Sequence, residues 1–381
     1  MVKAKRIALL IESSTSYGRS LIRGVLQYAN VAASWFFYNE PRSFSDALPN
    51  FAKHSLDGII MRDTPENMKL LELNVPTVVS IRYLESVEGV PIILGDSKRI
   101  GRMAARYFQE RGFRNFAYCG FENMPWSLER ERAFAEALPP DISFHVLHQS
   151  INPANYEGKL QELSEWLKDL PKPAALMACN DVRGESILEA CKLAEVKVPF
   201  EISILGVNND DMICDMVSPQ LSSIALNITK AGYQAAKTLD KMIKGESYDD
   251  LITIEPERVV ARASSDIFAV NDPEVAKALY FIDQNSRKKI HIDDLAAHVG
   301  INRRALERKF KHALNSTIYS AIKRAKIDAI RKMLTDTDIQ ISEIAYAMGF
   351  DDANHISRYF KQEMNVSPMK YRKKYGILHM D

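Results

Sequence analysis

The spacing of apolar and polar residues changes character once along the chain. Up to about residue 263, short runs of β-branched and aromatic residues alternate with amphipathic helical stretches. This alternation predicts βαβ units, with parallel sheets covered by helices on both faces. The predicted strands are Ile7–Glu12, Trp35–Tyr38, Leu56–Met61, Thr77–Ile81, Pro91–Leu94, Asn115–Cys119, Ser143–Leu147, Ala174–Ala178 and Ile202–Val207.

A short polar stretch separates this α/β body from a helical tail. It consists of Ser264–Asp266 and Asn271–Pro273. Asp272 is suited to cap a helix that has Pro273 at its first position. We therefore place a boundary near residue 268 and predict two domains, residues 1–267 and 268–381.

The tail contains an internal repeat, in which residues 292–301 are matched by residues 341–350. In each copy an apolar helix meets a glycine, Gly300 or Gly349, that can adopt the positive φ of a sharp turn. A second helix follows in each copy, with apolar residues four apart on one face. Each copy predicts a helix-turn-helix. Two helical hairpins packed as a plain bundle are the alternative, and the duplication favours DNA binding.

The segment between the copies predicts one long helix. Residues 317–334 carry apolar side chains at helical spacing and contain neither Pro nor Gly. Such a helix is roughly 27 Å long, close to the roughly 34 Å between successive major-groove faces of B-DNA. Two recognition helices held at this spacing could read adjacent segments of the major groove.

Charge is distributed unevenly between the two parts. The whole chain has 50 basic and 49 acidic residues, but residues 271–381 hold 20 basic and 14 acidic ones. The tail is therefore positive and the body negative. This asymmetry fits a C-terminal domain that meets phosphate groups and an N-terminal domain that does not.

Composition and motifs exclude several classes of protein. The four cysteines form no C-x-x-C pair, and Cys119, Cys179 and Cys191 lie in apolar contexts typical of reduced, buried thiols, which indicates a cytoplasmic protein. The apolar run Ile7–Ile11 is too short for a signal peptide, and no stretch is long enough to span a membrane. We find no Walker-type loop, protease or hydrolase motif, or His/Cys cluster at metal spacing, so we expect neither an enzyme nor a cofactor or metal.

Polar side chains follow several predicted strands. These are Ser13, Ser14 and Tyr17; Asp96; Asn180 and Asp181; and Asn208, Asn209 and Asp210. In open parallel sheets ligands bind beyond the carboxyl ends of strands, and this mixture of amides, hydroxyls and carboxylates suits a sugar better than a phosphate. For any one of these residues a helix N-cap or an Asx turn is an equally good interpretation.

The tail resembles an AraC-type DNA-binding domain over roughly residues 271–378, most clearly in residues 349–361 and 367–372. The resemblance implies six residues that face base edges: Arg304, Glu307, Arg308, Asn354, His355 and Arg358. Arginine can bind guanine, asparagine adenine, and glutamate can accept from cytosine. Arg308 and Arg358 could equally contact phosphates. The expected phosphate contacts are Lys309, Lys311, Lys361 and Arg372.

The body resembles the two-lobed, periplasmic-binding-protein-like core of the LacI/GalR regulators. The similar segments are residues 95–101, 111–118, 130–134, 180–181, 198–206 and 218–223. By this resemblance Asp96, Arg130, Asn180 and Asn208 line an effector cleft between two lobes. Asn208 occupies a stretch where that family often has an aspartate. We add Ser13, Tyr17, Trp126 and Asp181 to the expected effector site, although Trp126 could either stack on a sugar ring or fill the core.

A sensor of this type followed by an AraC-type tail resembles the family of xylose operon regulators. The resemblance implies a homodimer that binds a double-stranded operator or promoter and a small sugar, a pentose by preference. We expect an activator, which would contact RNA polymerase, while the sequence also allows a repressor; no membrane partner is expected. Sugar binding is expected to favour a closed arrangement of the lobes. The alternative is a solute-binding protein of a sugar uptake system, which would leave the tail without a role.

Overall fold

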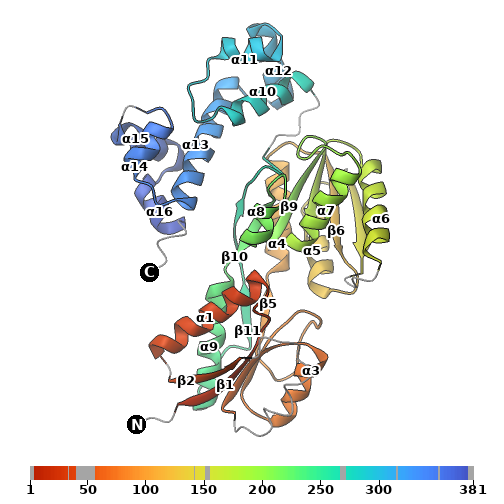
Figure 1. The fold of residues 1–381 in the computed structure, drawn as a ribbon, viewed down its shortest axis with the longest axis vertical. Coiled ribbons are helices and arrows are strands. Elements are labelled where there is room, and N and C mark those ends of the chain that lie inside the picture. Colours follow the sequence, from red (N-terminus) through yellow and green to blue (C-terminus); the bar gives the residue numbers. More distant parts are fainter. Residues whose placement is uncertain are drawn as a thin grey trace. The chain divides into compact units, whose positions relative to one another are not determined.

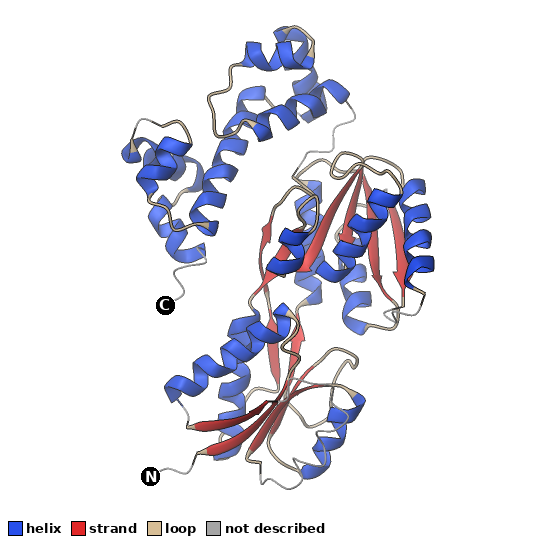
Figure 2. Cartoon of the chain, viewed as in Figure 1, coloured by secondary structure: helices blue, strands red, loops and turns tan. Residues whose placement is uncertain are grey.

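The computed structural model describes residues 4–32, 34–39, 56–140, 142–150, 155–266, 272–314, 316–350 and 352–375. The chain divides into two compact units, Met1–Asp266 and Ile267–Asp381. The first unit combines sheets and helices, and the second is built of helices (Figures 1 and 2). Among the described residues, no helix is both long enough and apolar enough to cross a membrane.

The N-terminal unit contains two six-stranded sheets, one in each of two lobes. The first sheet has the order β11-β5-β4-β3-β1-β2, and the second has the order β12-β10-β9-β8-β6-β7. Their strands are β1 Lys5–Leu10, β2 Trp35–Asn39, β3 Gly58–Arg62, β4 Thr77–Ser80, β5 Ile92–Gly95, β6 Asn115–Phe121, β7 Ser143–Gln149, β8 Ala174–Ala178, β9 Ile202–Asn208, β10 Ser222–Leu226, β11 Leu251–Ile254 and β12 Pro256–Val260. Within the described part, every pair is parallel except β10 with β12.

The nine predicted strands are all present, with ends that shift by a few residues. Three further strands, β10, β11 and β12, were not predicted. They are short, and β10 begins with two buried serines whose polar side chains suggest a loop. β11 alternates exposed and buried residues over only four positions, so its pattern is too brief to identify a strand.

Alternation along β1 shows how the first lobe is covered. Ile7 and Leu9 point to a core closed by α1 (Ser16–Ala32) and α9 (Ile228–Lys244), which lie side by side in Figure 1. The intervening residues of β1 point to the other core, which is closed by α3 (Pro65–Met68) and η2 (Lys69–Leu73). Both faces of the sheet are thus buried, as expected for parallel strands.

The second lobe is covered in the same way. One face of its sheet packs against α6 (Tyr156–Asp169) and α7 (Asp181–Leu193). The other face presents Phe116, which packs edge-to-face on Phe134 of α5 (Pro125–Glu136). The helix α4 (Ser97–Gln109) packs beside α5, and the short α8 (Asp211–Met216) follows β9. All four cysteines are free and buried in this unit.

The described chain passes between the lobes three times, from β5 to α4, from β10 to α9 and from β11 to β12. These passages are hydrogen-bonded to one another. The Asp96 amide donates to the carbonyl of Ile254 at 2.9 Å, and the Asn227 amide donates to the carbonyl of Glu255 at 3.1 Å. The Glu255 amide in turn donates to Oδ1 of Asn227 at 2.8 Å. The three passages therefore form one hinge.

The C-terminal unit contains two helical hairpins joined by a long helix. Its helices are α10 Pro273–Gln284, α11 Ile292–Val299, α12 Arg303–Leu314, α13 Ile318–Asp336, α14 Ile341–Ala347, α15 Ala353–Met364 and α16 Pro368–Tyr375. Asp272 caps α10 as predicted, because its Oδ1 accepts hydrogen bonds from the amides of Glu274 and Val275. Gly300 has φ 91° and Gly349 has φ 68°, so both turns use the left-handed conformation that the repeat predicted.

The predicted connecting helix is continuous. α13 begins after Thr317, whose hydroxyl accepts from the Ser320 amide at 3.1 Å, and it runs without a break for 19 residues. Its first half packs into the core of the first hairpin, with Leu306 and Phe310 of α12. Its second half, which includes Ile330, packs into the core of the second hairpin, with Phe360 of α15. One helix thus belongs to both cores.

The second core should be sensitive to truncation of its largest fully buried side chain. Phe360 is fully buried and packs edge-to-face on Tyr371. Replacing Phe360 with Ala should lower the free energy of unfolding of this unit by about 3–5 kcal/mol, because it removes buried apolar surface and leaves a cavity. Urea unfolding of the full chain, followed by hydrogen exchange of the amides in α13–α16, would measure the change. Tyr346→Ala is the control, because that ring is 68% exposed, and an equal loss in both variants would contradict the assignment.

Candidate effector cleft and DNA-reading helices

A cavity of about 390 Å³ lies between the two lobes of the N-terminal unit. Its walls come from segments that follow strands of both sheets, including Tyr17 and Arg82 from the first lobe and Asn180 and Asn208 from the second. The volume lies within the range of roughly 300–1,000 Å³ that is typical of pockets for small molecules. The carboxyl ends of the strands thus converge on one cavity, as the sequence predicted.

Six of the eight residues predicted for the effector site line this cavity. They are Tyr17, Trp126, Arg130, Asn180, Asp181 and Asn208. Ser13 and Asp96 are placed differently. The carbonyl of Ser13 accepts a hydrogen bond from Arg19 at 3.3 Å, and Asp96 caps α4 by accepting from the Arg99 amide at 2.9 Å. Asp96 therefore stands at the hinge in the N-cap role that the sequence left open.

Arg62 is the main cavity residue that the sequence interpretation missed. It is the last residue of β3, and it is 7% exposed. Its Nη1 donates to the hydroxyl of Ser80 at 3.0 Å and to the carbonyl of Ile81 at 3.4 Å. Its Cζ lies 4.2 Å from the ring centre of Tyr17, whose hydroxyl also bonds Ser80. The rule that ligands meet the carboxyl ends of strands applies to β3 as well, and it would have identified Arg62.

Arg130, within helix α5, is a buried arginine of the second lobe that also lines the cavity. It is 6% exposed, and its Nη1 donates to the carbonyl of Cys179 at 2.5 Å. Its Cζ lies 4.9 Å from the ring centre of Trp126, which also packs edge-to-face on Phe121. Trp126 therefore contributes to packing and also lines the cavity, where its stacking on a sugar ring stays a prediction. Burial lowers the pKa of the Arg130 guanidinium, and nearby groups that include Tyr17 oppose this shift.

The sequence interpretation also missed an ion pair, Arg82 with Glu12, in another part of the cavity wall. Arg82 donates from Nη1 to both carboxylate oxygens of Glu12, at 3.1 and 3.2 Å. Both residues line the cavity. Because the pair neutralises itself, it presents less net charge to a ligand than either residue would alone.

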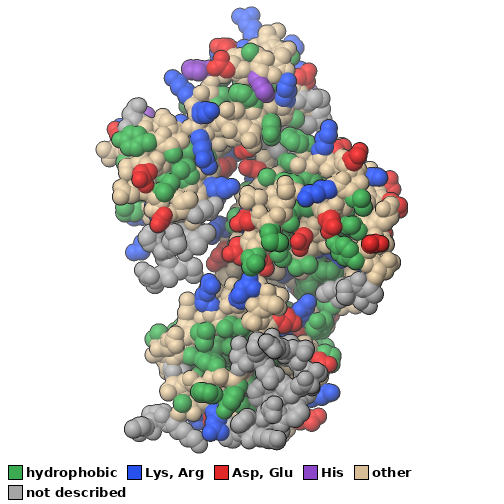
Figure 3. Space-filling view, viewed as in Figure 1, with side chains coloured by type: hydrophobic (Ala, Val, Ile, Leu, Met, Phe, Trp, Pro, Cys, Tyr) green, Lys and Arg blue, Asp and Glu red, His purple; other side chains and the backbone are tan. Residues whose placement is uncertain are grey.

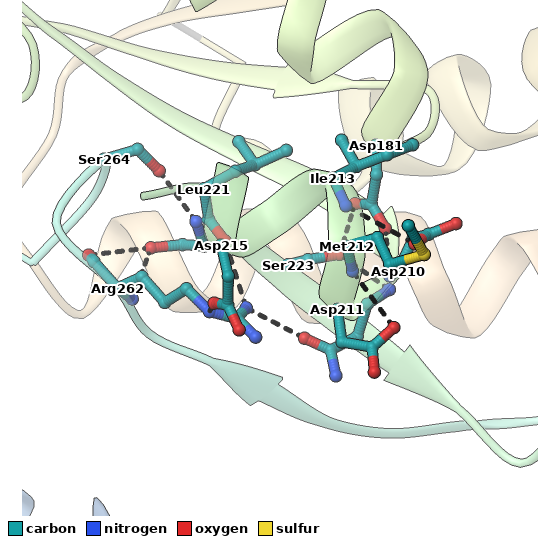
Figure 4. A network of polar contacts seen from close by, with 12 residues as sticks. Asp181, Asp210, Asp211, Met212, Ile213, Asp215, Leu221, Ser223, Arg262 and Ser264 are labelled. Carbon is teal, nitrogen blue, oxygen red and sulfur yellow. Dashed lines mark hydrogen bonds and ion pairs between the residues drawn. The ribbon is translucent and has the colours of Figure 1, made fainter. Parts of the chain in front are cut away.

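A network of polar contacts supports the wall formed by the second lobe (Figure 4). Asp181 is buried and accepts from the Ser223 hydroxyl at 2.5 Å and from the Asp210 amide at 2.7 Å. Burial raises the pKa of Asp181 to about 7, and these hydrogen bonds oppose the shift. Arg262 ties the same loop to the end of the unit, because it donates to Asn209 at 2.9 Å and pairs with Asp215 at 3.0 Å.

This loop also reaches across the cavity. Asp210 accepts from the Ser16 amide of the first lobe at 3.4 Å. Asn208 and Asn209 have φ values of 110° and 52°, in the left-handed region that residues other than glycine and asparagine rarely adopt. The loop therefore holds a constrained backbone at the point where it faces the opposite lobe.

The residues expected to read bases lie on the second helix of each hairpin. On α12, Arg304, Glu307 and Arg308 are exposed, and Glu307 accepts from Nε of Arg303 at 2.8 Å. On α15, Asn354, His355 and Arg358 are exposed; the amide of His355 bonds the N-cap Asp352 at 2.7 Å. Lys and Arg side chains lie across the face of this unit that is visible in Figure 3.

The four expected phosphate contacts divide into two pairs. Lys311 and Lys361 are exposed on α12 and α15. Lys309 instead pairs with Asp272 at 2.5 Å and with Glu274 at 3.2 Å, which ties α12 to the start of α10. Arg372 donates from Nε to the carbonyl of Leu334 at 3.2 Å. These contacts give Lys309 and Arg372 roles within the fold that compete with binding to phosphate.

Both parts of the chain match known families. Residues 105–265 match a periplasmic binding protein-like domain, and residues 295–374 match a helix-turn-helix domain. The chain is 30% identical over 379 residues to the xylose operon regulatory protein of Haemophilus influenzae, which covers 96% of this chain and 98% of the relative. The corresponding protein of Escherichia coli is 29% identical over 382 residues and covers 97% of each. The solved structure of a xylose-binding transcription activator has a TM-score of 0.69 and 27% identity, and covers 98% of this chain and 99% of that one. These matches confirm the predicted fold class.

The buried Asp181 predicts a pH dependence of stability. An unfolded aspartate has a pKa of about 3.9, whereas the pKa of Asp181 in the fold is about 7. Between these values the folded protein binds a proton that the unfolded chain has lost, so the contribution of Asp181 to the free energy of unfolding falls as pH rises through this window and is constant above it. Asp181→Asn should reduce the fall in unfolding free energy between about pH 5 and about pH 8 in urea titrations.

The matched control for this titration is Asp211→Asn, which removes an exposed carboxylate from the neighbouring helix α8. It should leave the pH dependence of the wild type unchanged. If the unfolding free energy of Asp181→Asn has the same pH dependence as that of the wild type between about pH 5 and about pH 8, the pKa of Asp181 lies below this range and the prediction is wrong.

Proposed function

The chain belongs to the family of xylose operon regulatory proteins, and on this premise we propose that it is a sugar-responsive activator of a pentose catabolic operon. A pentose of the xylose type binds in the cavity between the lobes, and the helix-turn-helix unit binds the operator. The observation that carries this proposal is the union, in one chain, of a polar cavity beside a hinge with two helix-turn-helix hairpins on one continuous helix. A sugar-uptake binding protein would have no use for the second unit.

The sugar acts through the hinge between the lobes. A ligand that bonds Tyr17 of the first lobe and Asn180 or Asn208 of the second gains its full set of contacts only when the lobes are closed. It therefore shifts the equilibrium between open and closed lobes by its difference in affinity for the two arrangements. Arg262, near the end of the unit, donates a hydrogen bond to Asn209 in the loop that follows Asn208, and its amide bonds Ser222. A movement of this loop on closure of the lobes would therefore also move the segment around Arg262, which precedes the DNA-binding helices.

The helices α12 and α15 insert into successive major-groove segments of one half-site. α13, with 19 residues, is about 28 Å long and holds the two hairpins at a fixed separation. A homodimer reads two half-sites, and the bound activator contacts RNA polymerase. Such a protein acts in the cytoplasm, where reduced thiols such as the four buried cysteines are stable.

Sugar binding and DNA binding should separate when the chain is cut at the linker. Deletion of residues 268–381 should leave the thermal stabilisation by sugars intact, because the cavity lies wholly within the first unit. A sugar at about a hundred times its Kd should stabilise the fold by about 2.7 kcal/mol. A screen of pentoses and hexoses against the full chain and the truncated chain, together with fluorescence anisotropy on promoter DNA, would test both functions. Loss of sugar binding on truncation would contradict the modular mechanism.

Arg358 distinguishes base reading from phosphate binding. If it bonds a base edge, Arg358→Ala should weaken binding to the operator by about 1–3 kcal/mol and leave binding to random DNA nearly unchanged. Anisotropy titrations on operator and random duplexes at several salt concentrations would measure this. Lys361→Ala, one turn further along the same helix, is the comparison for a phosphate contact. An equal loss on both duplexes with a lower salt slope in Arg358→Ala would exclude base reading.

A further inference from the structure

The final segment of the N-terminal unit is bound to the loop that faces the other lobe. Arg262 lies just after β12, and the chain continues from it toward the DNA-binding helices. Its side chain is 11% exposed, and Nη1 donates to Oδ1 of Asn209 at 2.9 Å and to the carbonyl of Leu221 at 3.1 Å. Nε donates to Asp215, near the end of α8, at 3.0 Å (Figure 4). One guanidinium therefore joins the end of the unit to three segments of the second lobe.

The loop at the other end of this contact responds to the first lobe. Asp210 accepts from the amide of Ser16 at 3.4 Å, and both Asn208 and Asp210 line the cavity. Asn209 lies between them in the chain but is not part of the cavity lining, and its side chain bonds Arg262. The positive φ values of Asn208 and Asn209 leave this loop few other conformations. A displacement of Asp210 toward the first lobe is therefore passed to Asn209 and is not absorbed by the loop.

Two neighbouring serines of β10 add a second connection between the same two segments. The hydroxyl of Ser223 accepts from the Asn209 amide at 3.0 Å and donates to Asp181 at 2.5 Å. The hydroxyl of Ser222 accepts from the Arg262 amide at 2.7 Å and donates to the Arg262 carbonyl at 2.9 Å. Successive side chains of a strand point to opposite faces, so one serine serves the cavity loop and the other serves the end of the unit. This arrangement accounts for two fully buried hydroxyls at the start of β10.

The residues that follow Arg262 form an ordered segment. The hydroxyl of Ser264 donates to the carbonyl of Ile204 in β9 at 2.7 Å. The hydroxyl of Ser265 bonds that of Tyr107 in α4 at 2.8 Å. Both serines are fully buried. A shift of Arg262 is therefore passed along hydrogen-bonded residues toward the second unit and is not lost in a loose end of the chain.

We propose that the contact between Arg262 and Asn209 carries the effector signal from the cavity to the DNA-binding unit, and that Arg262 is a coupling residue that binds neither sugar nor DNA. This inference rests on the proposed function and names the contact through which its two binding events communicate. Closure of the lobes moves the loop of Asp210 relative to the rest of the second lobe, and Arg262 transfers that movement to the end of the unit. Such a coupling is a free energy shared by two sites, so it can be removed while each site still binds its own ligand.

The test measures DNA binding by the full chain with and without saturating D-xylose. The DNA is a duplex that the wild type selects from a random-sequence library, and fluorescence anisotropy gives its Kd. In the wild type, D-xylose should change this Kd about fivefold or more, as is usual for coupled sites. In Arg262→Gln the factor should fall close to one, with a Kd for DNA between the two wild-type values. The Kd of D-xylose for the protein without DNA, measured by calorimetry, should stay close to that of the wild type.

Asn209 provides two variants that leave Arg262 in place. Asn209→Gly removes the acceptor of the hydrogen bond, and glycine adopts the φ of 52° without strain, so the factor should fall as in Arg262→Gln. Asn209→Asp keeps an acceptor, tolerates the left-handed conformation and gives the guanidinium a charged partner, so the factor should be retained. This pair decides the inference even if Arg262→Gln fails to fold.

Arg258→Gln is the matched control, because it removes one positive charge from β12, four residues before Arg262, and takes no part in the contacts described above. It should keep the wild-type factor. A wild-type factor in Arg262→Gln or in Asn209→Gly would overturn the inference and leave the proposed function standing. Loss of D-xylose binding by Asn209→Gly would also overturn it, because the contact would then support the cavity itself. A wild type that binds no sugar, or whose DNA affinity does not respond to the sugar it binds, would count against the proposed function and this inference together.

Discussion

The joint between the two lobes is the constraint on which the behaviour of the N-terminal unit depends. Three passages of the chain meet there, held by backbone bonds between Asp96 and Ile254 and by paired bonds between Asn227 and Glu255. Each lobe has densely packed cores of its own on the two faces of its sheet, so either lobe resists deformation more than the joint resists rotation. A ligand that touches both walls of the cavity therefore acts on the relative position of two nearly rigid bodies.

In the C-terminal unit the fixed quantity is the distance between the two helical hairpins. α13 supplies apolar side chains to the cores of both hairpins, and Lys323 on it pairs with Glu363 of α15 at 3.0 Å. The distance between the hairpins is thus set by the length of one helix and not by a flexible loop. A protein that reads two neighbouring segments of a duplex needs such a fixed spacing, because every degree of freedom frozen on binding would reduce affinity.

Periodicity predicted most of the fold but only part of the cavity. Long apolar runs identified nine strands, and the repeat with Gly300 and Gly349 identified both hairpins. The sequence did not predict strands that contain buried polar residues. The serines at the start of β10 suggest a loop, because their hydrogen-bond partners, such as Asp181, are distant in sequence. Asp96 fits a cleft residue and an N-cap equally well by type, and only its bond to Arg99 in three dimensions separates the two. Arg62 was missed because a charged residue after an apolar strand usually marks the surface.

Arg62 and Arg130 show why a binding site is a poor place to expect maximal stability. Burying a guanidinium that has no ion pair destabilises the empty protein, and the stacking of Arg62 on Tyr17 and of Arg130 on Trp126 opposes that cost. A ligand that supplied acceptors to these guanidinium groups would lower the cost further. Arg62 and Arg130 belong to different lobes, so a ligand that bonded both would be held best with the lobes closed, and the same two side chains would then contribute to affinity and to the conformational change.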